Sequence, residues 1–419
     1  MTNVLKEAQG NKIRYLDVND KDYQPSLAIE DKFVKSKNVR ILKIQLGLSC
    51  NYACTYCSQR FVKRPDELTK AEIEGFMEKL ENLHFSPDRS LKIELWGGEP
   101  FVYYKTMIPL VAALKEKFKD WENQPVFSVI TNGSILNEEI SQWLIDNDFA
   151  VSISHDGPGQ HVRGPDPLED LEIRNTIRNL YAILKPKNKI SFNSMLNKHN
   201  ISRKEIHQWF VEFTGDPDVV LGEGGLIDPY DEGGYSESLA TAEEHYQFRK
   251  VAFNDIRSTG GHIGFMGIIE KIDNFGRRIL QNDFNYDMGQ KCGMDRPDVI
   301  AVDLKGNILT CQNTSHVETA PNGKSHKAGN IQEIEKAKVQ SSTHWKDRPN
   351  CSTCPVLALC QGSCMYLEGN LWDRACDNAF SDNIVLFALA FEKLTGMIPT
   401  YILDPNLPKE RQSIWGSAS

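Results

Sequence analysis

Residues 50–57, CNYACTYC, place three cysteines within eight residues, spaced C-x3-C-x2-C with an aromatic residue before the last. A closed structural zinc site takes four protein ligands, and no histidine lies near Cys50, Cys54 and Cys57. Three thiolates in one loop instead suit an iron–sulfur cluster that leaves one iron open to a ligand from solution. The stretch therefore predicts an iron–sulfur site with one exchangeable position.

A second group of thiols follows more than 230 residues later. Its members are Cys292, Cys311, Cys351, Cys354, Cys360, Cys364 and Cys376. NCSTCPVLALCQGSC has the spacing C-x2-C-x5-C-x3-C, and VIAVDLKGNILTC before it alternates like a hairpin that turns at 305–307. A zinc ribbon is the alternative for C-x2-C, but seven ligands suit zinc poorly. Two cysteine regions predict two metal-binding regions on two domains.

Composition limits the partners and the cellular location that this protein can be expected to have. The formal charge of −9 over 419 residues argues against a nucleic-acid partner. No signal peptide and no apolar run of membrane-spanning length occur, so we expect a cytoplasmic protein with no membrane partner. Because the cytosol keeps thiols reduced, the ten cysteines are expected in metal or redox sites rather than in disulfides.

Strand-like and helix-like stretches alternate between the two cysteine regions. We expect strands at 42–46, 93–96, 126–130, 150–154, 190–194 and, more weakly, 219–221. Helices are expected over 69–83, 106–118, 137–145, 174–184 and 202–213, the first with a Thr69–Glu72 capping box. About six such units predict an α/β fold, a partial (β/α)6 TIM-like barrel two units short of closure.

Four loops follow strands of this barrel at the same end. They are CNYACTYC, Gly97–Pro100, Thr131–Ser134 and His155–Gly157. Chemistry in parallel α/β folds gathers at the carboxyl ends of the strands, so these loops are expected to converge on one site.

The cysteine spacing and its place after the first strand resemble the radical S-adenosylmethionine (radical SAM) superfamily. The resemblance implies that Cys50, Cys54 and Cys57 bind a [4Fe–4S] cluster whose open iron chelates S-adenosylmethionine. It also implies that Tyr56 packs near the adenine of that cofactor. The sequence itself names no catalytic acid or base.

The later loops extend the resemblance. WGGEP matches the segment that holds the amino group of S-adenosylmethionine, which implies contacts from Gly97, Gly98, Glu99 and Pro100. Glu99 is expected to pair with the ammonium. The loops TNGS and SHDGP resemble later strand ends, which makes Asn132 a cofactor-binding candidate and implies that Ser154 and Asp156 reach the ribose hydroxyls. The family more often has an apolar residue where this chain has His155.

The seven later cysteines resemble the SPASM extension of radical SAM enzymes, which holds auxiliary iron–sulfur clusters. The resemblance implies one [4Fe–4S] cluster on Cys351, Cys354, Cys360 and Cys376, and another on Cys292, Cys311 and Cys364. An eighth cysteine of some relatives is missing from Asn282–Gln290, so the second cluster is expected to be open or capped by Asp283 or Asp287. Anaerobic sulfatase maturases carry the complete set, and that subgroup is therefore expected to fit poorly.

The resemblance implies an oxidoreductase that generates a 5′-deoxyadenosyl radical and carries three [4Fe–4S] clusters. The leading interpretation is a peptide maturase that oxidatively crosslinks a ribosomally made precursor peptide. A SPASM-type dehydrogenase of a small molecule is the alternative. A non-catalytic iron–sulfur carrier is a third, but it would not need WGGEP or Tyr56.

Partners follow from the same interpretation. An external one-electron donor such as flavodoxin or ferredoxin is expected. About 38 residues precede the first barrel strand, too few for a leader-binding module, so recognition is expected in the acidic Gly222–Gly234 loop or on a separate leader-binding protein. The plain alternative for that loop is a solvated surface turn.

The sequence divides into five expected regions. They are an N-terminal extension (1–38), the radical SAM partial barrel (39–225), a linker or bridging region (226–290), the SPASM domain with its hairpin and short helices (291–382), and a C-terminal helix and tail (383–419). The helix is expected near 383–394, with a loose tail after residue 405.

Overall fold

The structure, a computed structural model, describes residues 34–65, 70–222, 224–261, 263–281, 289–340, 343–404 and 407–416. Within these ranges the strands form one sheet in the order β5-β4-β3-β2-β1-β6-β7-β8. Of the residues named above, Thr69, Asn282, Asp283 and Asp287 lie outside the described residues.

The sheet is parallel over most of its width. Its strands are β1 (Ile41–Gln45), β2 (Lys92–Trp96), β3 (Val126–Thr131), β4 (Ala150–Ser154), β5 (Ile190–Asn193), β6 (Val299–Asp303), β7 (Asn307–Leu309) and β8 (Lys327–Asn330). β1 to β5 pair in parallel in chain order, as the expected barrel requires. β7 and β8 are added in antiparallel fashion.

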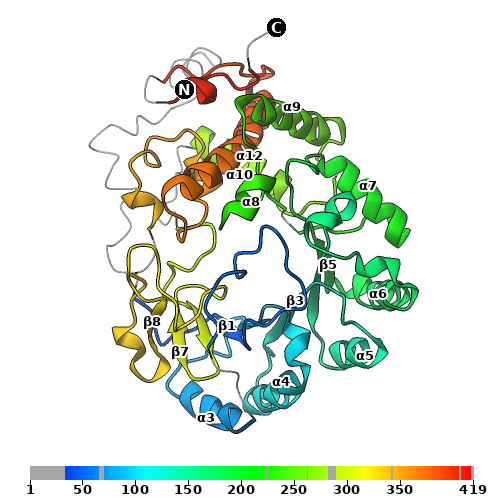
Figure 1. The fold of residues 1–419 in the computed structure, drawn as a ribbon, viewed down its shortest axis with the longest axis vertical. Helices are drawn as coiled ribbons and strands as arrows, with labels where there is room; N and C mark the ends of the chain where they lie inside the picture. The colour runs from blue at the N-terminus through cyan, green and yellow to red at the C-terminus, as the bar shows by residue number, and fades with distance from the viewer. Residues whose placement is uncertain are drawn as a thin grey trace.

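Helices α3 to α7 flank this sheet, and α9, α10 and α12 form a separate group above it in the view (Figure 1). The bounds of the helices are α3 (Lys70–Leu80), α4 (Tyr104–Phe118), α5 (Glu138–Asp146), α6 (Leu171–Leu184), α7 (Arg203–Thr214), α8 (Glu232–Glu237), α9 (Ala242–Ser258), α10 (Ile268–Gln281), α11 (Leu357–Cys360), α12 (Gly369–Thr395) and α13 (Lys409–Gln412). Among the described residues, no helix has the length and apolarity needed to cross a bilayer.

The expected partial barrel is confirmed, with a reduced sixth strand. The segment at 219–221 forms single parallel bridges, from Leu221 to Phe192 on one side and to Phe265 on the other. Local signals set the helices as expected, since Asn137 accepts a hydrogen bond from the Ile140 N–H and Ser202 caps α7.

The hairpin expected in a separate cysteine-rich domain belongs to the barrel sheet instead. β6 pairs in parallel with β1 along its whole length, from Ile41↔Val299 to Gln45↔Asp303. The sequence could not place this strand, because its partner lies about 250 residues earlier in the chain. The two cysteine regions therefore share one hydrogen-bonded sheet.

Side chains of the strands alternate between the outer core and a polar interior. Leu42 and Ile44 are buried in the hydrophobic core, whereas Lys43 faces the interior cavity. The Lys43 ammonium pairs with Glu94 at 3.2 Å, and the Trp96 indole N–H donates to the same carboxylate at 2.9 Å. The cavity has a volume of about 550 Å³, which is within the range of small-molecule sites.

The C-terminal part is more ordered than the sequence suggested. The helix expected near 383–394 is the second half of α12, a 27-residue helix that ends at Gly396 in the left-handed conformation. α12 packs against both α9 and α10. The described part of the expected loose tail is docked, because Arg249 of α9 donates to the carbonyls of Glu410, Ser413 and Ile414.

The contact between α9 and α12 predicts a pH-dependent stability. Burial lowers the pKa of His245 from 6.5 to about 4, and its Nδ1 lies 2.8 Å from the Ser381 hydroxyl. Between these values the unfolded chain binds a proton that the folded chain does not, so the free energy of unfolding decreases as pH falls. At pH 5 the free energy of unfolding is therefore about 2 kcal/mol lower than at neutral pH because of this one group.

His245→Asn removes the titrating group, so we expect the loss of stability between pH 7 and pH 5 to shrink by about that amount. Anaerobic urea unfolding at the two pH values measures it. His84→Asn, which removes an exposed imidazole, is the control and should leave the pH dependence unchanged. An equal pH dependence in His245→Asn and the unsubstituted chain would contradict the prediction.

Candidate active site

The first cysteine loop leaves β1 and runs to the middle of the molecule, below α8 (Figure 1). WGGEP supports its start, because the N–H groups of Gly98 and Glu99 donate to the carbonyls of Gly47 and Ser49 at 3.2 and 3.0 Å. A Cβ at Gly98 would lie 2.5 Å from the Ser49 oxygen. Only glycine therefore permits this approach of the two loops.

The three thiols of this loop face one another. Burial raises the pKa of Cys54 to about 11, and the neighbouring Cys57 and Cys50 add to the rise while Arg163 opposes it. Cys50 also has a raised pKa, first through burial. Within the described ranges, no three Cys, His, Asp or Glu side chains form a site for a single metal ion. The donor set is soft and clustered, which fits an iron–sulfur group.

Glu99 has a different environment from the one expected. Its side chain is 1% exposed, and the Asn132 N–H and the Thr131 hydroxyl donate to its two oxygens at 2.7 Å each. It also caps a short 3-10 helix that begins at Pro100, accepting from the Phe101 N–H at 3.2 Å. The carboxylate expected to meet an ammonium is thus engaged by its own chain and joins the WGGEP and TNGS loops.

Asp156 likewise supports the cysteine loop rather than facing an open space. It is 0% exposed, and its carboxylate accepts from the Tyr56 hydroxyl, the Met195 N–H and Arg163. Arg163 also donates to the Tyr56 oxygen at 2.8 Å. Asp156 thus holds Tyr56 in place, and its contact with ribose hydroxyls stays a prediction. Ser154 of the same motif is buried at the end of β4.

Asn132 connects the TNGS loop to the first cysteine loop. Its amide donates to the Asn51 side-chain oxygen at 2.9 Å, and the Asn51 amide donates to the Ser134 hydroxyl at 2.7 Å. The Ser134 hydroxyl returns a hydrogen bond to Asn132. This ring fixes Asn51, the residue after the first cysteine.

His155, the residue unusual for the resemblance, has a packing role. It stacks on Trp209 with ring centroids 4.7 Å apart. The Gly157 N–H donates to its Nδ1, so Nε2 carries the proton and donates to Asp166 at 2.9 Å. These contacts hold α7 against the end of β4.

The later thiols influence one another electrostatically within two sets, and their division into two ligand groups stays a prediction. Burial raises the pKa of Cys351 to about 12, with Cys376 and Cys360 adding to the rise. Burial, with Cys360 and Cys376 as neighbours, also raises the pKa of Cys354. These four thiols form one group, which we call the four-cysteine site.

The remaining thiols, Cys292, Cys311 and Cys364, form the three-cysteine site. Burial raises the pKa of Cys311 to about 11, and Cys292 adds to it. Cys364 has a pKa raised to about 12, by burial first and then by Asp228 and Cys311, while a hydrogen bond from Tyr230 opposes the rise. Asp228 and Tyr230 belong to the glycine-rich segment after 222, and no sequence motif pointed to either.

That glycine-rich segment is an interior wall rather than the surface turn considered above. Cβ atoms at Gly222 and Gly224 would lie 1.8 Å from Asn193 Oδ1 and the Ser194 carbonyl. Farther along, Gly234 packs on Tyr56 of the first cysteine loop. The segment therefore contacts both cysteine regions.

Gln45, at the end of β1, ties the two cysteine regions together directly. Its amide donates to the carbonyls of Gln312 and Thr314 at 2.7 Å each, immediately after Cys311. Gln59, after Cys57, donates to the Asn313 side chain at 3.2 Å. The first cysteine loop and the three-cysteine site thus share a hydrogen-bonded boundary.

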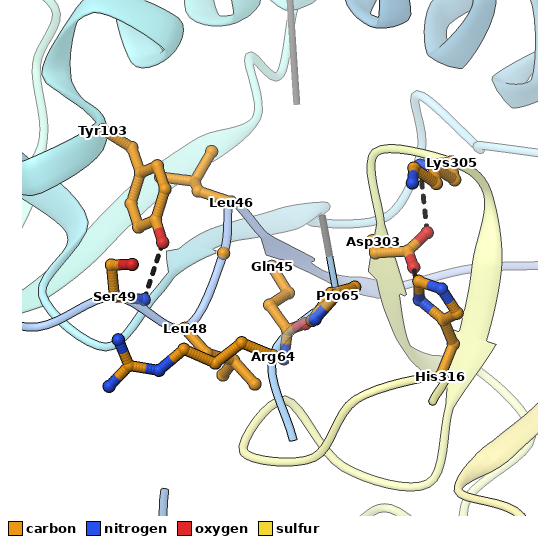
Figure 2. A pocket seen from close by; sticks show the side chains of 11 residues that line it. Gln45, Leu46, Leu48, Ser49, Arg64, Pro65, Tyr103, Asp303, Lys305 and His316 are labelled. Atoms are coloured by element: carbon orange, nitrogen blue, oxygen red, sulfur yellow. Dashed lines mark hydrogen bonds and ion pairs between the residues drawn. The ribbon is translucent and has the colours of Figure 1, made fainter. Parts of the chain in front are cut away.

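A small pocket lies behind this boundary, between the first cysteine loop and the β6–β7 hairpin (Figure 2). On one wall the Tyr103 hydroxyl accepts from the Ser49 N–H at 2.6 Å, and on the other His316 pairs with Asp303 at 2.7 Å. Its volume of about 130 Å³ is below that of ordinary ligand sites, which run from about 300 Å³. The pocket therefore supports the loop rather than holding a nucleoside-sized molecule.

Comparison with known proteins agrees with this arrangement. Residues 44–209 match the model of the Radical SAM superfamily. The cysteine-type anaerobic sulfatase-maturating enzyme of Clostridium perfringens (strain 13 / Type A) is 21% identical over 338 residues, which cover 75% of this chain and 85% of that enzyme. The radical SAM cyclopropyl synthase TigE of Paramaledivibacter caminithermalis is 24% identical over 176 residues, 39% of this chain and only 36% of that enzyme.

The fold is shared with a solved structure, native anSMEcpe with bound AdoMet and Cp18Cys peptide. The TM-score is 0.59 at 19% sequence identity, and the match covers 85% of this chain and 99% of the other. The sulfatase maturases, expected to fit poorly because of the missing eighth cysteine, are thus relatives along most of the chain.

The environment of Glu99 predicts a coupled loss of stability and cofactor affinity. Glu99→Gln places an amide N–H₂ against donors, so we expect a decrease of about 1–3 kcal/mol in the free energy of unfolding. The loops it joins would loosen, and affinity for S-adenosylmethionine would decrease with it. Urea unfolding and equilibrium binding of S-adenosylmethionine measure the two quantities.

The exposed Glu116→Gln is the matched control and should change neither quantity. If Glu99→Gln lowered the affinity for S-adenosylmethionine without changing the stability, Glu99 would contact the ammonium directly. The role of Glu99 in joining the WGGEP and TNGS loops would then be contradicted.

Proposed function

We propose that this chain, whose residues 44–209 match the model of the Radical SAM superfamily, oxidatively modifies a precursor peptide, forming a crosslink. The observation that carries the proposal is the gathering of ten thiols into one group of three on the barrel and two groups, of three and four, beside it. A simple electron carrier would not need the built loops around the first group.

Cys50, Cys54 and Cys57 would hold the first [4Fe–4S] cluster. With S-adenosylmethionine bound and one electron supplied, that group provides reductive cleavage to methionine and a 5′-deoxyadenosyl radical, which abstracts a hydrogen atom. An acidic carrier such as flavodoxin or ferredoxin is the proposed electron donor. The cytoplasm is the proposed location.

The chain's own residues shape the cofactor position. Gly97 and Gly98 let the WGGEP backbone lie directly against the cysteine loop, which fixes the start of that loop. Glu99 and Asp156 supply rigidity through their hydrogen bonds, and Tyr56 is held as one wall. Such preorganised walls exclude water from a reactive radical.

The four-cysteine and three-cysteine sites would hold the auxiliary clusters. The three-cysteine site is one thiolate short, and we propose that its remaining position is exchangeable and available to substrate. The sequence candidates for a cap, Asp283 and Asp287, lie outside the described residues. Asp228, adjacent to Cys364, is a further carboxylate at this site.

A peptide substrate is supported by the relatives. The similar anSMEcpe was solved with a peptide bound, and its fold covers most of this chain. A separate leader-binding protein remains part of the proposal, because the glycine-rich segment is packed inside. Oxidation of a small molecule is the second candidate, favoured by the barrel cavity of about 550 Å³.

The cluster assignment predicts the iron content. Three clusters require about twelve irons and twelve sulfides per chain after anaerobic reconstitution. Replacing Cys50, Cys54 and Cys57 by alanine should leave about eight irons, because the other groups do not share ligands with the first. Iron and acid-labile sulfide analyses measure this. A zinc-loaded chain, or one with only four irons, would contradict the auxiliary assignment.

The reaction itself is tested with peptides. The reconstituted enzyme, dithionite and S-adenosylmethionine should release 5′-deoxyadenosine, and a true precursor peptide should lose two hydrogens by mass. Cys54→Ala should abolish both products, because two thiolates cannot hold the open cluster. Chromatography and mass spectrometry over candidate peptides and small alcohols provide the measurement, and oxidation of the small molecules alone would favour the second candidate.

A further inference from the structure

Arg411 makes a direct contact with a thiol of the four-cysteine site. Its Nη2 donates to Cys376 Sγ at 3.3 Å. Burial raises the pKa of Cys351 and Cys354, and the Arg411 charge works against the rise at both. One guanidinium therefore acts on three of the four thiols.

The contact is built into the fold rather than left to a mobile tail. Asp377 accepts from Arg411 Nη2 at 2.6 Å and from its Nε at 3.2 Å. The guanidinium also lies over the ring of the buried Phe380, 5.0 Å from its centroid. Arg249 holds the carbonyls around this segment, and Ile414 is fully buried. Asp377 and Phe380 therefore hold the Arg411 guanidinium beside Cys376.

Two more cations complete the surroundings of this site. Arg348, which packs 3.4 Å from the Trp372 ring centroid and donates to the Leu367 carbonyl, acts on Cys351. Lys291 acts on Cys360, whose pKa burial raises to about 11. Each of the four thiols thus faces at least one positive charge.

The three-cysteine site has charges of both signs around it. After burial, Asp228 adds to the raised pKa of Cys364 and Asp295 to that of Cys292, whereas Lys43 and Lys35 lower the pKa of Cys292. Arg411 instead makes its contact with Cys376 of the four-cysteine site.

We propose that the hydrogen bond and the charge of Arg411 raise the reduction potential of the cluster that the four-cysteine site would hold. Reduction adds a negative charge, and hydrogen bonds or cations at the sulfurs stabilise the reduced form. A cluster held there would accept the one electron left on the oxidised substrate and give it to a one-electron carrier protein, and no bond or proton would change in that transfer. This inference rests on the proposed function.

The test is a redox titration of the reconstituted full-length protein, followed by electron paramagnetic resonance. The background variant Cys54→Ala removes the first cluster, and Cys376→Ala and Cys364→Ala assign the two remaining signals. Arg411→Gln removes the charge and the hydrogen bond. Arg411→Lys keeps the charge, and Arg257→Gln, at an exposed ion pair with Glu392 of α12, is the matched control.

In the background variant, Arg411→Gln should raise the ratio of oxidised to reduced cluster at the four-cysteine site at least tenfold at a fixed potential. This change corresponds to a midpoint potential lower by about 59 mV for one electron. The midpoint potential in Arg411→Lys should lie between those of the background variant and Arg411→Gln. Arg257→Gln should leave the midpoint potential unchanged. The signal of the three-cysteine site should keep its midpoint in all variants.

An unchanged midpoint in Arg411→Gln, or an equal shift of both signals, would overturn the inference. So would loss of iron from both Arg411→Gln and Arg411→Lys, since Arg411 would then be needed to hold the cluster rather than to tune it. A chain that takes up no auxiliary iron fails the proposed function as well. If the unsubstituted chain holds about twelve irons and Arg411→Gln leaves the midpoint potential unchanged, this inference fails while the proposed function stands.

Discussion

The buried thiols impose the main constraint on this molecule. Burial raises the pKa of Cys54, Cys311 and Cys351, so without a partner these thiols remain protonated at neutral pH. Thiolate is the form that binds metal, and binding in such a site must therefore release protons. The chain offsets part of this cost with Arg163 at the first site and with Arg348, Arg411 and Lys291 at the four-cysteine site.

Close contacts between backbone segments hold the cysteine loops in position. Gly98 lets WGGEP touch the cysteine loop, and the glycines after 221 let an interior segment lie against the end of β5. Glu99 and Asp156 then accept three hydrogen bonds each from donors of the chain itself. These charged residues, which the motifs suggested as ligand contacts, thus join neighbouring loops, and the glycines let the loops touch.

Local signals in the sequence predicted much of the fold. The strands β1 to β5, the caps at Asn137 and Ser202, and the separation of the later thiols into two groups all rest on short-range pattern or on motif spacing. The pairing of β6 with β1 rests on a contact across about 250 residues, and spacing carries no information on it. Arg163, Asp228 and Arg411 were missed for the same reason, since each meets its thiol only through tertiary structure. The expected last helix starts too late for another reason. It is expected from 383, whereas α12 begins at Gly369, because the cysteine and polar residues at 369–382 hide the helical period.

The pairing of β1 with β6 also has a consequence for synthesis of the protein. β1 leaves the ribosome long before residues 299–303, so one side of the growing parallel sheet has an unpaired edge during most of translation. β1 reads ILKIQ, an apolar strand of the kind that invites pairing with another chain when its edge is bare. Lys43 in its middle places a charge on the inner face, a feature that discourages such pairing. The last strands to emerge therefore close the sheet, and truncated chains that end before β6 would be the ones prone to aggregate.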